Sequence, residues 1–157
     1  MKSLTALAAL ALACLPAFGA EQVNPACDLL TENEARAALG ATARESIMNA
    51  EMTGSSDCSW VSEQGGSIAL SRARGPAFQG DAMPADGYRN WRETFAASGA
   101  VEDLAGLGDA AFLFVDGTVE TRAIVGILRQ GNVLLIGTQG VSRAALMQLA
   151  ELAAGRV

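Results

Sequence analysis

Residues 110–138 read AAFLFVDGTVETRAIVGILRQGNVLLIGT, and this stretch decides the fold. It contains three apolar runs of strand length, at 110–115, 121–128 and 133–138. Asp116-Gly117 is a hairpin-turn signal, and Gln130-Gly131-Asn132 separates the second run from the third. Strands joined by such tight turns pair antiparallel, because a parallel pair needs a long crossover. The stretch therefore predicts an antiparallel meander.

The N-terminal half is predicted to contain a helix followed by extended segments. Thr31 and Glu34 form a capping box that starts a helix over residues 32–39. The run Ser67-Ile68-Ala69-Leu70-Ser71 alternates apolar and small residues, as a half-buried strand does. Other strands are expected at 44–50 and from 58 to 61, and other helices at 88–98 and from 142 onward.

The predicted order of elements is α-β-β-β-α-β-β-β-α. It indicates an α+β domain with an antiparallel sheet of about five to six strands and helices packed on one face of that sheet. At 157 residues the chain is too short for two full domains, so residues 21–157 are expected to form one.

Residues 1–20 have the layout of a secretory signal peptide. Lys2 precedes an apolar run over residues 4–15, and small residues follow up to Ala20. A membrane-spanning helix needs roughly 20 apolar residues, so no span is expected. We therefore expect an exported protein, periplasmic or secreted. The alternative is a lipid anchor on Cys14, which small residues precede.

The composition excludes several classes of function. The chain has no histidine, which removes catalytic triads, histidine general bases and the commonest zinc sites. A formal net charge of −6 argues against a nucleic-acid partner. The acidic residues are scattered, and no pair is close enough in sequence to nominate for acid–base catalysis. We expect no cofactor and no enzymatic activity.

Two cysteines remain after the leader, Cys27 and Cys58. An even number of cysteines in an exported chain predicts a disulfide. The alternatives are two free thiols or a pair of metal ligands, although a soft metal would lack further histidine or cysteine ligands here.

Several motifs resemble a known family. They are Cys27-Asp28-Leu29-Leu30-Thr31, then Cys58-Ser59-Trp60, and later the segment GLGDAA at residues 106–111. Together they resemble a family of small exported bacterial proteins of unknown function, many of them lipoproteins. The resemblance covers residues 27–150. It implies a Cys27–Cys58 disulfide and an α+β domain outside the cytoplasm, and it implies no reaction.

The glycine- and proline-rich segment over residues 75–87 is a candidate surface for a ligand or partner. It is flanked by two pairs of arginines, which could together bind a carboxylate or phosphate: Arg72, Arg74, Arg89 and Arg92. Ordinary solvated surface charge is the simpler interpretation. Phe78 and Met83 lie in the same segment, either folded back on the core or exposed as an anchor for a partner protein.

The aromatic residues allow two interpretations. Trp60 follows Cys58 closely, and packing over a disulfide is favoured over stacking on a ligand. Tyr88, Trp91 and Phe95 share one face of a helix. That spacing is typical of a core stripe, and an aromatic pocket is the alternative.

These observations favour an exported, non-catalytic binding or interaction module in the cell envelope or periplasm. Its expected partner is an envelope protein or an anionic small ligand. Two other classes stay open: an envelope structural or assembly accessory lipoprotein, and a hydrolase that uses only carboxylates.

Overall fold

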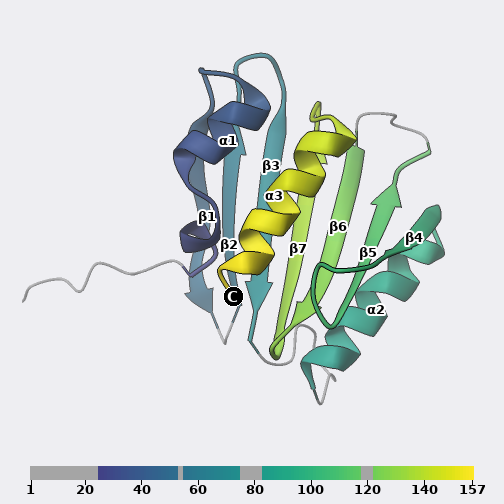
Figure 1. Cartoon of the computed structure of the whole chain (residues 1–157). Coiled ribbons are helices and arrows are strands. Elements are labelled where there is room, and N and C mark those ends of the chain that lie inside the picture. The colour runs from purple at the N-terminus through teal and green to yellow at the C-terminus, as the bar shows by residue number, and fades with distance from the viewer. Residues whose placement is uncertain (1–24, 53–54, 75–82, 118–121) are drawn as a thin grey trace, which may run out of the picture.

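The computed structural model describes residues 25–52, 55–74, 83–117 and 122–157. Within these residues, seven strands form one antiparallel sheet in the order β1-β2-β3-β7-β6-β5-β4 (Figure 1). The strands are β1 (Arg44–Met52), β2 (Ser55–Val61), β3 (Ser67–Ala73), β4 (Ala100–Leu104), β5 (Ala110–Val115), β6 (Arg122–Arg129) and β7 (Asn132–Gln139). The helices are α1 (Glu32–Leu39), α2 (Pro84–Ala96) and α3 (Arg143–Gly155), with a short 3-10 turn, η1 (Cys27–Leu29). The predicted α+β fold class is confirmed.

Two meanders meet at the centre of the sheet. Strands β1, β2 and β3 follow one another, as do β4 to β7, and the last strands of the two sets pair with each other. The β3–β7 ladder runs from Ser67 opposite Gln139 to Ala73 opposite Val133. Because successive side chains of a strand point to opposite faces, this register fixes which residues share a face across the whole sheet.

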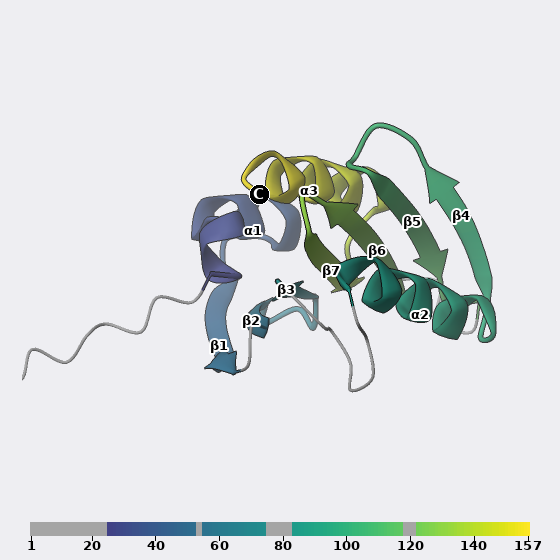
Figure 2. The same ribbon diagram turned by 90° about the horizontal axis from the view of Figure 1, so that it is seen from below.

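The helices lie on both faces of the sheet. Helix α1 packs on β1 to β3, and α3 packs on β6, β7 and α1. Helix α2 packs against β4 to β7 on the opposite face, which Figure 2 shows from below. We call the two sides the α1/α3 face and the α2 face.

The expectation that all helices pack on one face was therefore wrong. Buried side chains alternate along β5: Ala111 and Leu113 belong to the core under α1 and α3, whereas Phe112 and Phe114 pack with α2. A strand with large apolar residues at every position is buried on both faces, and the sheet needs a covering layer on each side.

The structure also has one strand more than expected, β4. This five-residue edge strand contains Glu102 and Asp103, so it lacks the apolar run by which its neighbours were recognised. Helix α2 begins at Pro84, four residues earlier than residue 88. Proline suits the first turn of a helix because it has no N–H to leave unpaired, and the Asp86 carboxylate accepts the Met83 N–H at 3.0 Å.

Covalent and ionic contacts join the N-terminal segment to the rest of the domain. Cys27 and Cys58 form a disulfide with a Cα–Cα distance of 5.2 Å. At the other end of the chain, Arg156 donates to the Leu29 carbonyl at 2.8 Å and to both carboxylate oxygens of Glu34 at 2.7 and 2.6 Å. These contacts lower the pKa of Glu34 to about 2. Among the described residues, no helix has the length and apolarity needed to cross a membrane.

Candidate functional site

The two halves of the α2 face differ in composition. Strands β5 to β7 present large apolar side chains to α2, among them Phe112, Phe114 and Val133. Strands β2 and β3 present small or polar side chains to the same face: Ser55, Asp57, Ser67, Ala69 and Ser71. On their other face these two strands carry Cys58, Trp60, Ile68 and Leu70, all in the core. The other face also carries two buried polar residues, Ser56 and Arg72, so β2 and β3 are mainly apolar there and mainly small or polar on the α2 face.

A groove lies at the boundary between these halves, beside α2. Its volume is about 390 Å³, within the range of small-molecule sites. Residues of β3, β6 and β7 form its floor, and Trp91 and Phe95 of α2 form its wall. The floor residues are Ser67, Ala69, Ser71, Arg122, Ile124, Leu135, Gly137, Thr138 and Gln139. A second hollow of about 190 Å³ continues it and shares Ser71, Trp91 and Leu135. We call the two together the α2 groove.

Two glycines show how different the two halves are. A Cβ added to Gly137, on the groove floor, would meet only Ile124 Cγ1 at 3.8 Å, which is an ordinary contact. A Cβ added to Gly126, one strand away on the same face, would lie 2.2 Å from the ring of Phe112. Among the residues that the structure describes, the sheet is closely packed under α2 and open beside it. The exposed position of Ala69, on the central strand β3, agrees with this.

Packing within the aromatic layer holds the wall of the groove in place. The ring of Phe95 stacks on Trp91 with 5.5 Å between centroids and on Phe114 at 5.0 Å. Phe112 contacts both Phe95 and Tyr88. Trp91 and Phe95 are half-buried, so one part of each side chain belongs to the core and another faces the groove. Both interpretations of this aromatic stripe hold at once.

Charged side chains lie at both ends of the groove. Arg122 lines the larger hollow, and Asp57 lines the smaller one together with the buried Arg72. In the ladder registers, Arg122 shares a row with Gln139 and Ser67, whereas Asp57 shares a row with Ser71 and Leu135. Those rows are four residues apart, so the charges are separated by about 13 Å along the strands alone.

A larger hollow, of about 560 Å³, lies at the C-terminal end of α3. Its lining residues, including Gln148 and Leu152, all come from that helix and its last turn. A surface built from one helix lacks walls that could enclose a ligand, whereas four strands and a helix contribute to the α2 groove.

The four arginines expected to flank residues 75–87 do not form one cluster. Arg72 is only 8% exposed, and its Nε donates to Asn132 Oδ1 at 3.1 Å. The Arg72 guanidinium also donates to the Pro25 carbonyl at 3.4 Å. Arg74 is exposed at the end of the same strand. A buried arginine with two structural acceptors is part of the fold and cannot serve as a surface anion receptor.

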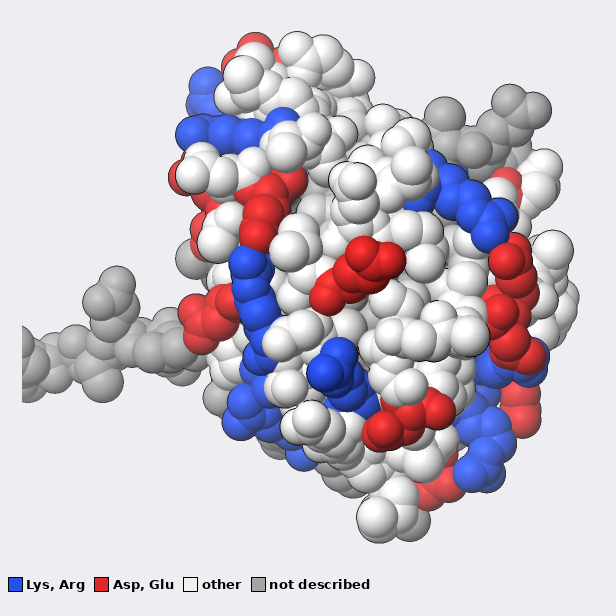
Figure 3. Space-filling view, viewed as in Figure 1, with Lys and Arg blue, Asp and Glu red and all other residues white. Residues whose placement is uncertain are grey.

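The two α2 arginines each pair with an acidic residue. Arg89 bonds Asp86 at 3.2 Å within the helix, and Arg92 makes two bonds to the Asp103 carboxylate on β4, at 2.9 and 3.1 Å. Burial raises the pKa of Tyr88 beside this pair, and the Asp103 charge acts in the same direction. Basic and acidic side chains also alternate on the α1/α3 face (Figure 3).

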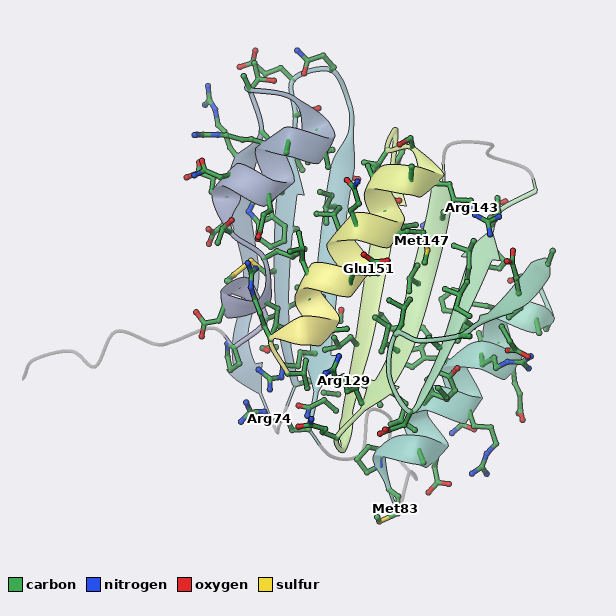
Figure 4. All side chains as sticks on the ribbon, viewed as in Figure 1. Arg74, Met83, Arg129, Arg143, Met147 and Glu151 are labelled. Atoms are coloured by element: carbon green, nitrogen blue, oxygen red, sulfur yellow. A yellow bond between two sulfur atoms is a disulfide. The ribbon has the colours of Figure 1, made fainter. Side chains whose placement is uncertain are left out.

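The apolar candidates had different outcomes. Met83 is 62% exposed and precedes the first turn of α2, so of the two alternatives it takes the exposed one. Phe78 lies outside the described residues. Figure 4 shows Arg74 and Met83 at the same end of the molecule. The side chain of Met83 points away from the sheet there.

The cysteines settle one of the open alternatives. In the described part of the chain, the potential metal ligands that come together are Cys27, Cys58 and Glu45. Both sulfurs are in the disulfide, so neither can act as a thiolate ligand. The predicted disulfide is confirmed, and Trp60 is fully buried in the core that contains Cys58.

Sequence reasoning missed the groove. Its signal was present as a period of two, in Ser55 and Asp57 on one strand and Ser67, Ala69 and Ser71 on the next. The alternation over residues 67–71 predicts only a half-buried strand, and Ser55 and Asp57 were expected in a turn before the strand at 58–61 rather than in β2. What the alternation could not show was that α2 would cover only the neighbouring strands and place Trp91 beside the serines.

Comparisons with family models, with curated proteins and with solved structures found no match for this chain.

Proposed function

We propose that the chain is an exported, non-catalytic binding module and that the α2 groove is its ligand site. The observation that carries the proposal is the half-covered α2 face. A folded sheet that needs α2 to bury its apolar strands leaves an open, polar floor next to an aromatic wall. Concave sites with a few polar groups and aromatic walls are where small ligands bind.

The chemistry of the groove supports binding rather than turnover. Of the residues that line it, Asp57 is the one carboxylate, and the two guanidiniums are those of Arg122 and the buried Arg72. General acid–base catalysis by carboxylates uses a pair of them on either side of the reacting bond. The groove offers hydroxyls, one amide and an aromatic surface, which orient a ligand without transferring a proton.

The disulfide supports export. Disulfides persist in oxidising compartments and are rare in the cytosol. Together with the leader-like sequence at residues 1–20, which lies outside the described residues, it supports a periplasmic or secreted location. A lipid anchor on Cys14 is the alternative form of the same proposal.

The test is backbone and indole NMR of the isotopically labelled protein with a fixed panel of probes. The panel contains chitotriose, maltotriose, citrate, inorganic phosphate, decanoate and tetra-alanine. Binding in the groove shifts amide signals of β3 and β7 together with the indole N–H of Trp91. The buried Trp60 indole serves as the internal reference, because the chain has two tryptophans.

The decisive variant is Gly137→Val, which places a side chain in open space on a strand and fills the groove. Gly155→Ala is the matched control, since a Cβ there also meets open space but lies at the end of α3. We expect the groove shifts to disappear in Gly137→Val and to persist in Gly155→Ala. Shifts that survive in Gly137→Val, or a panel that moves no groove signal, contradict the proposal.

A further inference from the structure

We infer that the ligand of the α2 groove is a short neutral oligosaccharide, whose ring packs on Trp91 while its hydroxyls bond to the floor. The inference rests on the proposed function, because it names the ligand class of the same site. Three features carry it: the hydroxyl floor, the aromatic wall and the balance of charge.

The floor offers side-chain groups only. All seven residues of β3 pair with β7 on one side and with β2 on the other, so their backbone N–H and C=O groups are already used in the sheet. A peptide therefore cannot bind here by adding a strand, which needs an unpaired edge. A ligand must instead exchange hydrogen bonds with Ser67 and Ser71, each of which can donate and accept. Sugar hydroxyls have this same dual character.

The wall supplies the apolar contact. One face of a sugar ring exposes C–H groups, and an indole combines a large apolar surface with an electron-rich face that attracts them. Trp91 lines both hollows, so it lies where the two join, beside Ser71 and Leu135. Stacking between Trp91 and Phe95 keeps the ring from turning away, which reduces the entropy lost on binding.

The charges argue against the other small-ligand classes. An anion would meet Arg122 in the larger hollow. In the smaller hollow Arg72 is already bonded to Asn132 and to the Pro25 carbonyl, and the Asp57 carboxylate would repel an anion there. A hydrocarbon chain would strip water from the serine hydroxyls without replacing their hydrogen bonds, which is unfavourable. A neutral polyhydroxylated ligand suits the larger hollow, because the planar groups of Arg122 and Gln139 can each bond to adjacent hydroxyls.

The expected anion site is thereby revised. That expectation depended on four converging arginines, of which Arg72 is buried and Arg89 and Arg92 are paired with acidic residues. In the α2 groove no such concentration of positive charge occurs among the described residues that line it.

The experiment compares ligand classes on the same protein. The purified protein is applied to an array of neutral and acidic glycans, and the strongest neutral binder is titrated by calorimetry. Ser67→Ala and Ser71→Ala each remove one hydroxyl and leave the ladder intact, so each should weaken binding about fivefold, as a lost hydrogen bond does. Trp91→Phe keeps an aromatic core contact with a smaller ring and should also weaken binding. Gly155→Ala should bind as the parent does.

The outcomes separate the ligand class from the function. Neutral glycans that bind and lose affinity in Ser71→Ala and Gly137→Val support the inference. If phosphate, citrate, decanoate or tetra-alanine shifts the groove signals while no neutral glycan binds, the ligand class is overturned and the binding function stands. If no glycan and no probe affects the groove, both are overturned.

Discussion

Gly126 and Gly137 occupy neighbouring strands on the same face of one sheet, yet they have opposite surroundings. Gly126 lies under the ring of Phe112, where the sheet has no room for a methyl group. Gly137 lies on the floor of the α2 groove, where a side chain would project into open space. A glycine can thus be required by packing or leave a space for a ligand, and its sequence context does not distinguish the two.

The largest effect is expected when a large side chain is removed from the closely packed half of the α2 face. Phe112→Ala should lower the free energy of unfolding by about 3–5 kcal/mol, as large-to-small changes of buried aromatics do. Phe112 is fully buried and contacts Tyr88 and Phe95. Urea unfolding followed by circular dichroism measures the loss. A loss below about 1 kcal/mol would show that α2 does not seal this half.

Overfilling the packed half should have the next largest effect. Gly126→Ala should destabilise by about 1–3 kcal/mol, because its methyl group displaces the Phe112 ring. The double variant Gly126→Ala/Phe112→Leu should recover part of that loss, since the two side chains share one space. If Gly126→Ala lowered the free energy of unfolding equally in the parent protein and in Phe112→Leu, the two residues would not compete for one space. That result would contradict the comparison of the two glycines.

The two helix layers should respond differently to acid. The folded-state pKa of Glu34 is lowered from its ordinary value of 4.5 to about 2, mainly by its hydrogen bonds to Arg156. A depressed carboxyl pKa stabilises the fold above the unfolded pKa, and this contribution is lost as the pH falls from 4.5 toward 2. Because the two side chains are 21% and 34% exposed, we expect the loss to be about 1–2 kcal/mol.

Hydrogen exchange measured across that pH range locates the effect. Protection of α1 and α3 should fall, whereas protection of α2, which aromatic packing holds, should change less. Glu34→Gln should remove most of the pH dependence of this protection, because it removes the charge that pairs with Arg156. Glu32→Gln is the matched control, since the Glu32–Arg36 pair is exposed and lies within one helix. If the two variants changed the pH dependence of protection equally, the Glu34–Arg156 pair would not be its source.

The smallest effects are expected on the open half. Gly137→Ala should change the free energy of unfolding by less than about 0.5 kcal/mol, or stabilise slightly by restricting the unfolded chain. Ser71→Ala should be equally mild, because its side chain lies at the groove rather than in the core. A loss above about 1 kcal/mol in either variant would mean that the floor is packed in the folded protein.

Local signals explain which parts of the fold could be predicted from the sequence. The Thr31–Glu34 capping box acts within one turn, and the hydroxyl and carboxylate make the expected bonds at 3.3 and 2.7 Å. Turn residues and apolar runs placed β3, β5, β6 and β7 close to their observed bounds. The paired cysteines needed only an even count and an exported chain.

The remainder depended on contacts between distant residues. Arg72 is buried because Asn132 and Pro25 lie beside it, 60 and 47 residues away in the sequence. Helix α2 packs on the face of the sheet to which β5 points Phe112 and Phe114. Which face that is depends on the register of the strands, which the sequence does not show directly. The groove depends both on contacts between distant residues and on strand register, so no local sequence pattern predicts it.

The central β3–β7 ladder also constrains the order in which the chain can fold. Residues 67–73 pair with residues 133–139, so the centre of the sheet can form only when nearly the whole chain is available. Contacts of such long sequence separation slow folding, since the loop between them must be closed before they form. Until then β3 is an unprotected edge, and its serines keep that edge less attractive to another chain than an apolar strand would be. The residues that we assign to ligand binding in the finished protein thus also limit mispairing while it folds.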